Sequence, residues 1–251
     1  DFMEKKLSLL SDWIIESSSL VIFSGAGMST ESGLPDFRSS KGLWKNTDPR
    51  KLASVEALNN NTKNFYDFYK MRINALNEVK PHEGHFILAE WENKNIVKHI
   101  ITQNVDGFHK RAGSKSVSEL HGSLGICRCN ECAVEYPSDK LIEKDFPTCE
   151  KCSGKLRPGV VLFGEMLPAD ALEKADFESA NSDLFIVIGS SLEVSPANYF
   201  PVQAKKSGAK LVIVNLESTH LDHIADMVIP GKTKEVLKEL DNQISLRTTK
   251  E

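Results

Sequence analysis

The sequence contains no run of about 18 apolar residues, which is the length that a membrane-spanning helix needs. Its beginning lacks the order of basic, apolar and small residues that marks a secretory signal. The 31 Lys and Arg residues are fewer than the 35 Asp and Glu residues and are scattered, whereas a nucleic-acid surface needs clustered positive charge. We therefore expect a cytoplasmic protein that contacts no membrane and binds no nucleic acid directly.

The sequence also has no internal repeat and no low-complexity segment. What it has are five short runs rich in Val, Ile and Leu, separated by segments with helical spacing such as residues 4–17. Because these runs are nearly continuous in apolar residues, they are typical of strands buried on both faces. They predict an α/β fold with a Rossmann-like doubly wound parallel sheet. The predicted strands are residues 20–23, 99–102, 184–188, 211–214 and 227–229.

Cysteine is scarce but regularly spaced. Cys129 and Cys132 form one Cys-x-x-Cys pair, and Cys149 and Cys152 form a second one after a spacer of sixteen residues. This spacing is typical of a zinc site with four thiolates, which leaves no open position on the metal and predicts a structural Zn²⁺. Two disulfides are one alternative, and they are not favoured in a reducing compartment. A redox Cys-x-x-Cys pair is the other, and it would not need a duplicate. The fifth cysteine, Cys127, could compete with Cys129 as a ligand.

Two segments interrupt the series of predicted strands. Residues 43–91 are helical and aromatic in pattern, and residues 127–154 carry the cysteine pairs. We expect them to form a smaller domain, composed of a helical module (43–91) and a zinc ribbon (127–154). The Rossmann-like domain would then comprise residues 1–42, 92–126 and 155–251, and a crevice between the two domains would hold a ligand.

The first predicted strand is followed directly by Gly25-Ala26-Gly27. Two glycines one residue apart let the backbone turn sharply and approach a pyrophosphate. Thr30 occupies the place of the third glycine of the dehydrogenase fingerprint, so the motif does not favour hydride transfer. Asp36, Phe37 and Arg38 follow the turn, where the alternative is a surface loop with a solvated ion pair.

Residues 25–38, GAGMSTESGLPDFR, resemble the NAD-binding signature of the sirtuins, which are NAD-dependent protein-lysine deacylases. Further segments match this family in the same order, so the resemblance spans nearly the whole chain. They are residues 102–107 (TQNVDG), His121-Gly122, the two cysteine pairs, residues 189–191 (GSS) and residues 214–217 (VNLE).

The resemblance implies a site for NAD made by several loops. It implies that the pyrophosphate lies at the turn of residues 25–29, the nicotinamide beside Asn104 and Asp106, and the adenosine near residues 189–191 and 215–217. The residues expected to bind the cofactor are Gly25, Ala26, Gly27, Ser29, Thr30, Asp36, Phe37, Arg38, Gln103, Asn104, Val105, Asp106, Gly189, Ser190, Ser191, Asn215, Leu216, Glu217, Lys232 and Thr233.

The resemblance also implies the chemistry. In the family's mechanism the carbonyl oxygen of an acyl-lysine attacks the glycosidic carbon as nicotinamide leaves, and a histidine activates the ribose hydroxyl that captures the acyl group. His121 matches that histidine, and Asn104 and Asp106 match its catalytic partners. The ordinary pKa of histidine, near neutrality, suits a general base. The products would be nicotinamide, free lysine and O-acyl-ADP-ribose, with Phe37 shielding the reacting centre.

The acylated lysine of a protein substrate is expected to lie between the domains, in a peptide that adds as a strand. The expected contacts are Val161, Phe163, Gly164, Glu165 and Val194. Residues 160–163 could instead form a core strand.

Tyr69 and Arg72 resemble the Tyr-x-x-Arg of sirtuins that remove succinyl or malonyl groups. An ordinary amphipathic helix with an exposed arginine is the alternative. Deacetylation is therefore predicted first, with removal of acidic acyl groups as an extension. Transfer of ADP-ribose to a protein and non-catalytic sensing of NAD remain as alternative functions.

Overall fold

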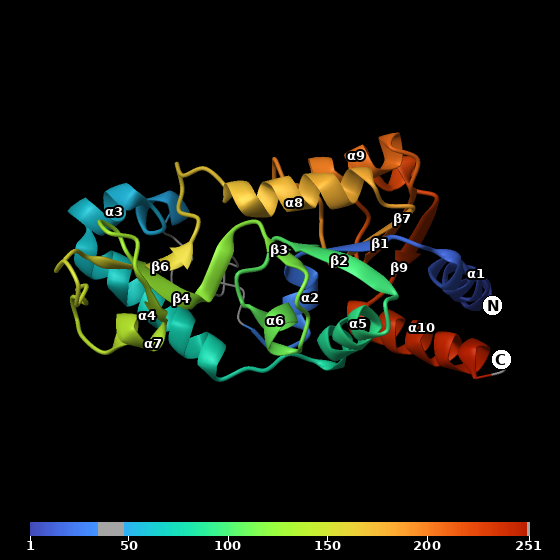
Figure 1. Cartoon of the computed structure of the whole chain (residues 1–251), viewed down its shortest axis with the longest axis horizontal. Helices are drawn as coiled ribbons and strands as arrows, with labels where there is room; N and C mark the ends of the chain where they lie inside the picture. The colour runs from blue at the N-terminus through green and yellow to red at the C-terminus, as the bar shows by residue number, and fades with distance from the viewer. Residues whose placement is uncertain (35–47, 250–251) are drawn as a thin grey trace.

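The computed structural model describes residues 1–34 and 48–249, which form two sheets side by side along the length of the molecule (Figure 1). The larger sheet has six strands in the order β3-β2-β1-β7-β8-β9, and the smaller has three in the order β5-β4-β6. Both chain termini lie at the end that holds the larger sheet, and α3, α4 and α7 lie around the smaller one (Figure 1).

The larger sheet is parallel throughout. It contains β1 (Leu20–Ser24), β2 (Val97–Thr102), β3 (Val117–Glu119), β7 (Leu184–Ile188), β8 (Lys210–Asn215) and β9 (Met227–Pro230). All five predicted strands are confirmed, with ends that move by at most two residues. The sixth, β3, was missed because an edge strand of three residues gives no apolar run. The α/β fold with a doubly wound parallel sheet is therefore confirmed.

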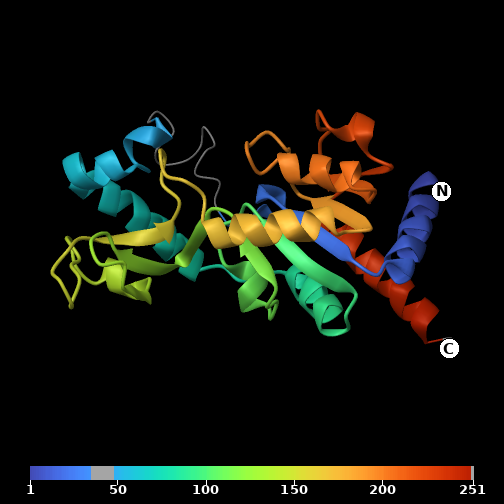
Figure 2. The same ribbon diagram turned by 45° about the horizontal axis from the view of Figure 1, so that its top comes forward.

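Helices cover both faces of this sheet, as alternate residues of β1 illustrate. Ile22 points into a core that it shares with α1 (Phe2–Glu16), α5 (Glu83–Asn93) and α10 (Thr233–Thr248). Phe23 points the other way, into a core with α8 (Ala169–Ala180) and α9 (Tyr199–Lys206). Figure 2 shows α8 lying across that second face. Burial on both faces explains why the central strands are largely apolar.

Three short elements lie at the carboxyl ends of the strands or on the loops beyond them. They are α2 (Ala26–Thr30), α6 (Phe108–Arg111) and a 3-10 turn, η2 (Asp222–Ile224). Because the first two directly follow β1 and the loop after β2, they place the motifs of residues 25–30 and 102–107 at one edge of the sheet.

The smaller sheet is antiparallel and contains β4 (Gly122–Cys129), β5 (Glu135–Pro137) and β6 (Leu156–Val160). The helical segments η1 (Pro49–Lys51), α3 (Val55–Asn60), α4 (Thr62–Asn77) and α7 (Asp139–Ile142) accompany it. One core lies within this small domain. It contains aromatic side chains of α4 and apolar residues of β4 and β6, with Tyr136 of β5 packed against it.

Packing supports domain limits that differ from those expected from the sequence. Leu88 and Trp91 of α5 lie in the core beneath the larger sheet, which supports a helical module that ends before α5 rather than at residue 91. The smaller sheet begins at Gly122 and ends at Val160, beyond the predicted limits of 127 and 154. We therefore propose a small domain made of residues 48–80 and 122–163. Within the described residues, every helix is too short or too polar to span a bilayer.

His99 of β2 is buried in the larger sheet. Its Nδ1 lies 2.7 Å from the Ser116 hydroxyl and its Nε2 2.7 Å from the Ser118 hydroxyl, so the neutral ring is held on both sides. Burial lowers the pKa of His99 to about 4, from an ordinary value of 6.5.

This burial predicts an acid-sensitive contribution to stability. Between about pH 6.5 and 4 the unfolded chain binds a proton at His99 and the folded chain does not, so the free energy of unfolding falls as the pH falls. One such group contributes a slope of up to about 1.4 kcal/mol per pH unit. Urea unfolding of wild type and His99→Leu across this range should give a shallower slope for the variant. His220→Leu, at an exposed position, should keep the wild-type slope; equal slopes for wild type and His99→Leu would contradict the prediction.

Candidate functional site

The turns after β1 and β7 pack backbone against backbone. The Gly25 N–H donates to the Ile188 carbonyl (3.1 Å), and the Gly27 N–H donates to the Gly189 carbonyl (2.7 Å). A Cβ on Gly27 would lie 2.8 Å from the Gly189 Cα, and one on Gly189, whose φ is +66°, would lie 2.4 Å from the Met28 nitrogen. Both turns therefore require glycine for their mutual contact, before any ligand is considered.

The loop after β2 joins these two turns through its amide side chains. The Asn104 side chain donates to the Gly25 carbonyl (2.9 Å), and the Gln103 side chain accepts from the Ser190 hydroxyl (2.9 Å). The Val105 carbonyl accepts from the Leu124 N–H (2.7 Å) and so connects the loop to β4. Three of the predicted loops are therefore brought together at one edge of the sheet.

Asp106 is the buried carboxyl group of this site, with 5% of its surface exposed. It accepts hydrogen bonds from the Ser29 hydroxyl on α2 and from the Phe108 N–H at the start of α6 (2.9 Å for the latter). Burial raises the pKa of Asp106, and the two hydrogen bonds oppose that effect. The group therefore fixes α2 against α6.

His121 lies between β3 and β4, half-buried, with its Nδ1 3.0 Å from the Gln103 carbonyl oxygen. A carbonyl oxygen only accepts, so Nδ1 carries the hydrogen, and the neutral form of the ring would have its lone pair on Nε2. The His121 carbonyl in turn accepts from the Val161 N–H (2.8 Å), which fixes the segment that follows β6. The ring is thus oriented by the same loop that carries Asn104 and Asp106.

The segment after β6 is not a strand, because β6 ends at Val160. Instead, the Phe163 N–H donates to the Ala53 carbonyl (2.8 Å), and Ser54 and Phe163 form an isolated parallel bridge. The Phe163 side chain is 49% exposed and Gly164 has φ +88°. Val194, on the loop after β7, is also partly exposed. These residues remain predicted substrate contacts.

Glu165 has a structural partner that could not be predicted from the sequence. Both of its carboxylate oxygens accept from the guanidinium of Arg157 at 2.7 Å, and Oε1 also accepts from the Leu162 N–H (2.9 Å). Arg157 is only 2% exposed. The pair therefore fixes the shape of the loop, and any contact of Glu165 with substrate would be made by a carboxylate that is already engaged.

Tyr69 and Arg72 lie on α4, but Tyr69 is 1% exposed and packs against Phe65 and Phe68. Burial raises the pKa of Tyr69 to about 12. The half-buried guanidinium of Arg72 lies 5.7 Å from the Tyr69 ring centroid. The acidic-acyl hypothesis consequently depends on Arg72, because the Tyr69 phenol belongs to the small-domain core.

The predicted adenosine residues lie at the ends of β7, β8 and β9. The Asn215 side chain donates to the Glu217 carbonyl (2.9 Å), and the Gly231 N–H donates to the Asn215 carbonyl (3.2 Å). Thr233 is buried, and its hydroxyl donates to the Glu31 carboxylate, which also accepts from the Lys234 N–H. The sequence analysis missed this role of Glu31. Ala26, Thr30, Ser191, Leu216 and Lys232 are exposed, and Asp36, Phe37 and Arg38 lie outside the described residues.

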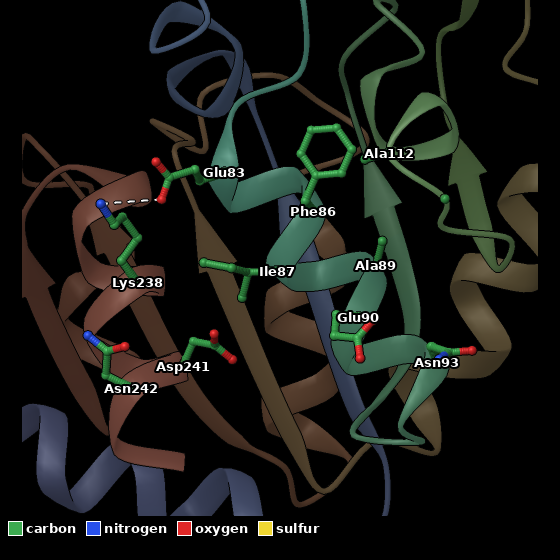
Figure 3. A pocket seen from close by; sticks show the side chains of 11 residues that line it. Glu83, Phe86, Ile87, Ala89, Glu90, Asn93, Ala112, Lys238, Asp241 and Asn242 are labelled. Carbon is green, nitrogen blue, oxygen red and sulfur yellow. Dashed lines mark ion pairs between the residues drawn. The ribbon is translucent and has the colours of Figure 1, made fainter. Parts of the chain in front are cut away.

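A groove of about 660 Å³ lies elsewhere, between α5 and α10 (Figure 3). Phe86 and Ile87 form its apolar part, and an ion pair of Lys238 with Glu83 (3.2 Å) crosses one end. Its lining contains none of the predicted site residues, so it is separate from the site at the strand ends.

The four paired cysteines form one cluster in which all Sγ atoms lie within 4.8 Å of one another. The Sγ atoms of Cys129 and Cys152 are 3.4 Å apart, and those of Cys132 and Cys149 are 3.7 Å apart. Tetrahedral zinc with Zn–S bonds of about 2.3 Å places sulfurs about 3.8 Å apart. The donor set therefore fits one structural Zn²⁺.

The backbone around the cluster supports the same assignment. The Glu131 N–H points at the Cys129 Sγ and the Lys151 N–H at the Cys149 Sγ, each at 3.3 Å, so the two turns are equivalent. Such donors favour the thiolate form that binds metal. Cys127 lies outside the cluster, with its Sγ 3.4 Å from the Pro137 carbonyl oxygen. It therefore does not replace Cys129.

Comparisons with known proteins agree with this geometry. The sequence model of the Sir2 family matches residues 25–196. A protein of Oceanobacillus iheyensis named NAD-dependent protein deacetylase is 53% identical over 237 residues, which cover 94% of this chain and all of the relative.

Two solved structures are similar over almost their whole length. A mutant Sir2 homologue in complex with ADP-ribose superposes with a TM-score of 0.90 at 38% identity, covering 97% of this chain and 98% of that one. A Sir2 complex with a p53 peptide and NAD⁺ superposes with a TM-score of 0.85 at 38% identity, covering 96% and 99%.

The cluster predicts one zinc ion per chain and a clear difference between two cysteines. Cys149→Ser should lose the metal and destabilise the small domain, because a ligand is removed from a closed tetrahedral site. Cys127→Ser should keep it, because that thiol points elsewhere. Elemental analysis of the purified variants measures the zinc content. Equal loss of zinc from both variants, or a wild-type chain without zinc, would overturn the assignment.

Proposed function

The chain belongs to the Sir2 family, and from this membership we propose that it is an NAD-dependent protein-lysine deacylase acting on acylated lysine side chains. The observation that carries the mechanism is the hydrogen bond between His121 Nδ1 and the Gln103 carbonyl oxygen. It orients the imidazole beside the loop of Asn104 and Asp106, where a proton would have to be removed from a ribose hydroxyl.

The residues present fit NAD. The glycine turns leave no side chain between the backbone and a pyrophosphate, and the buried carboxyl of Asp106 and the amide of Asn104 lie beside them. We assign the pyrophosphate to residues 25–29, the nicotinamide to Asn104 and Asp106, and the adenosine to Ser190, Asn215 and neighbouring residues. When bound, NAD supplies an electrophilic glycosidic carbon and a leaving group, nicotinamide.

His121 acts as the general base in this proposal. With Nδ1 donating to the carbonyl of Gln103, Nε2 is the nitrogen that accepts the proton, and the resulting imidazolium stays hydrogen-bonded. With NAD bound, the ribose oxygen that loses its proton to His121 would take the acyl group. One water molecule would be consumed overall, and the products would be free lysine, nicotinamide and O-acyl-ADP-ribose.

Asn104 and Asp106 shape the place where the nicotinamide would lie. Asn104 is held by two hydrogen bonds, one from its side chain to Gly25 and one from its N–H to the Thr102 hydroxyl (3.1 Å). Asp106 is held by Ser29 and Phe108. Because these contacts exist without a ligand, the groups are oriented in advance, which reduces the cost of reaching the reactive geometry.

The substrate peptide would lie between the domains, where Val161 follows β6 and Val194 follows β7. The main chain of residues 161–163 already pairs with His121 on one side and Ala53 on the other, so it forms a bridge between the two domains. We propose that side chains of Phe163 and Val194 contact the lysine stem.

The zinc cluster stabilises the small domain and takes no part in the chemistry. Four thiolate ligands require a reducing compartment, which supports a cytoplasmic location.

His121→Ala tests the core of this mechanism. Loss of a general base should lower kcat by about 10²–10⁴-fold, while NAD still binds. Mass spectrometry of an acetyl-lysine peptide and of released nicotinamide measures the reaction. His223→Ala, at an exposed position, should retain wild-type activity. If NAD labelled in the adenine ring instead transfers its label to a protein without acyl-lysine, ADP-ribosyl transfer replaces deacylation as the proposed function. If neither a deacylated peptide nor a labelled protein forms, non-catalytic sensing of NAD replaces it.

Arg72→Met tests the acyl preference separately. We expect acetyl-lysine to be cleaved by wild type and variant alike, so that Arg72 is not needed for activity. The Tyr69 phenol lies in the core, so Tyr69 and Arg72 do not form an exposed pair that could bind the distal carboxylate of a succinyl group. Matched acetyl-lysine and succinyl-lysine peptides are compared by mass spectrometry. Succinyl cleavage by wild type that falls at least about tenfold in the variant would instead establish Arg72 as the group that binds an acidic acyl chain.

A further inference from the structure

Three histidines outside the predicted NAD site are buried directly beneath its glycine turn. They are His82 and His85 at the start of α5 and His109 on α6, with exposed fractions of 8%, 0% and 3%. The ring centroids of His82 and His85 are 4.3 Å apart, and those of His85 and His109 are 5.2 Å apart. Burial lowers the pKa of all three, that of His85 to about 2 and that of His109 to about 4. The cluster is therefore neutral at physiological pH.

His109 begins a chain of hydrogen bonds that ends at Asn104. Its Nε2 lies 2.7 Å from the Ser24 hydroxyl, which donates to the Thr102 hydroxyl (2.8 Å). Thr102 in turn accepts from the Asn104 N–H (3.1 Å). Since the Ser24 hydroxyl has one hydrogen and gives it to Thr102, Nε2 of His109 is the donor to Ser24. Ser24 immediately precedes Gly25, so this chain connects the glycine turn with the nicotinamide loop.

His82 holds the other end of the same turn. Its Nε2 donates to the Met28 carbonyl on α2 (2.8 Å), and its Nδ1 accepts from the Gly84 N–H (2.9 Å). The Nδ1 atom of His85 accepts from the His82 N–H (3.1 Å), and the His85 ring packs edge-on against the Phe108 ring. The residues before and after the Gly25-Ala26-Gly27 turn are therefore both bonded to this cluster.

The helix that carries His109 is also held by a predicted catalytic residue. Asp106 accepts from Phe108, the first residue of α6, and from Ser29 at the end of the glycine turn. One four-residue helix is thus fixed to β1 through His109 and to α2 through Asp106. A change in the position of the His109 ring would move both Asp106 and the hydrogen-bond chain to Asn104.

Stability alone does not account for this cluster. Among the described residues, the His85 Nε2 and His109 Nδ1 atoms have no hydrogen-bond partner. A buried polar atom without a partner costs free energy, and an apolar side chain of similar size avoids that cost. What the imidazoles provide that a leucine cannot is directional bonding to Ser24 and Met28.

We propose that His109 is a positioning residue for the deacylase site, which together with His82 holds the glycine turn in register with Asn104 and Asp106 so that NAD binds in the reactive geometry. This inference rests on the proposed function. His109 does not contact substrate directly in this proposal, because its ring is enclosed beneath the turn.

The test compares three substitutions of buried histidines. His109→Leu removes the hydrogen bond to Ser24, and His109→Gln keeps a donor at a similar distance along the side chain. His99→Leu is the matched control, because it removes an equally buried histidine of β2 that bonds to Ser116 and Ser118 and not to the turn. The readouts are Kd for NAD by calorimetry, kcat with KM for NAD and for the acyl-peptide, the thermal midpoint and the zinc content.

We expect His109→Leu to lower kcat/KM for NAD by at least about tenfold and to raise Kd for NAD, because small displacements of positioned groups are costly. KM for the acyl-peptide should stay within about twofold. His109→Gln should recover most of the loss, and His99→Leu should lower the thermal midpoint without this selective effect. Equal losses in His99→Leu and His109→Leu, or no recovery in His109→Gln, would overturn the proposal.

Two further outcomes are also decisive. If His109→Leu does not fold, Ser24→Ala tests the same chain with the ring intact, and it should reproduce the selective loss for NAD; an unchanged Kd and kcat/KM would overturn the proposal. If the wild-type chain releases no nicotinamide with an acyl-peptide, the proposed function fails. The Kd values for NAD of His109→Leu and His99→Leu then still decide the positioning role.

Discussion

The contact on which the site depends is the one between two glycine turns at the carboxyl edge of the large sheet. The Gly27 N–H binds the Gly189 carbonyl, and a Cβ on either residue would collide with the backbone of the other turn. Because neighbouring strands in a parallel sheet are about 4.8 Å apart, their following loops can touch only where side chains are missing. This contact sets the position of α2, and α2 carries Ser29, which binds Asp106. The parts of the site that we propose to bind NAD and to position His121 are therefore built around one backbone interface.

A second feature of the site is that its polar groups are oriented by the backbone more than by one another. Gly25, Met28 and Gln103 all offer carbonyl oxygens, and these accept from Asn104, His82 and His121. Backbone carbonyls keep their acceptor character at every pH, so the tautomers of His82 and His121 do not depend on the ionisation of a neighbouring carboxylate. A site organised in this way retains its geometry when the charge of the bound substrate changes during the reaction.

How much the sequence could predict follows from the range of each interaction. The five long strands and the four zinc ligands were predictable because burial on both faces and a fixed Cys-x-x-Cys spacing act over a few neighbouring residues. The edge strand β3, the pairing of Glu165 with Arg157, the capping of α10 by Glu31 and the burial of Tyr69 were not. Each depends on residues that meet only after the chain has folded. The same holds for His109 and Ser24, which lie 85 positions apart.

The strand β4 connects the two halves of the molecule. It begins one residue after His121 and ends at Cys129, the first zinc ligand. Its pairing with β6 is interrupted by a register shift between Ser123 and Cys127. The end near His121 and the end near the metal are therefore paired separately. A displacement of the backbone at the cysteine cluster can therefore be taken up at this irregularity, before it reaches the pairs of Gly122 with Val160 and of Ser123 with Gly159 beside His121.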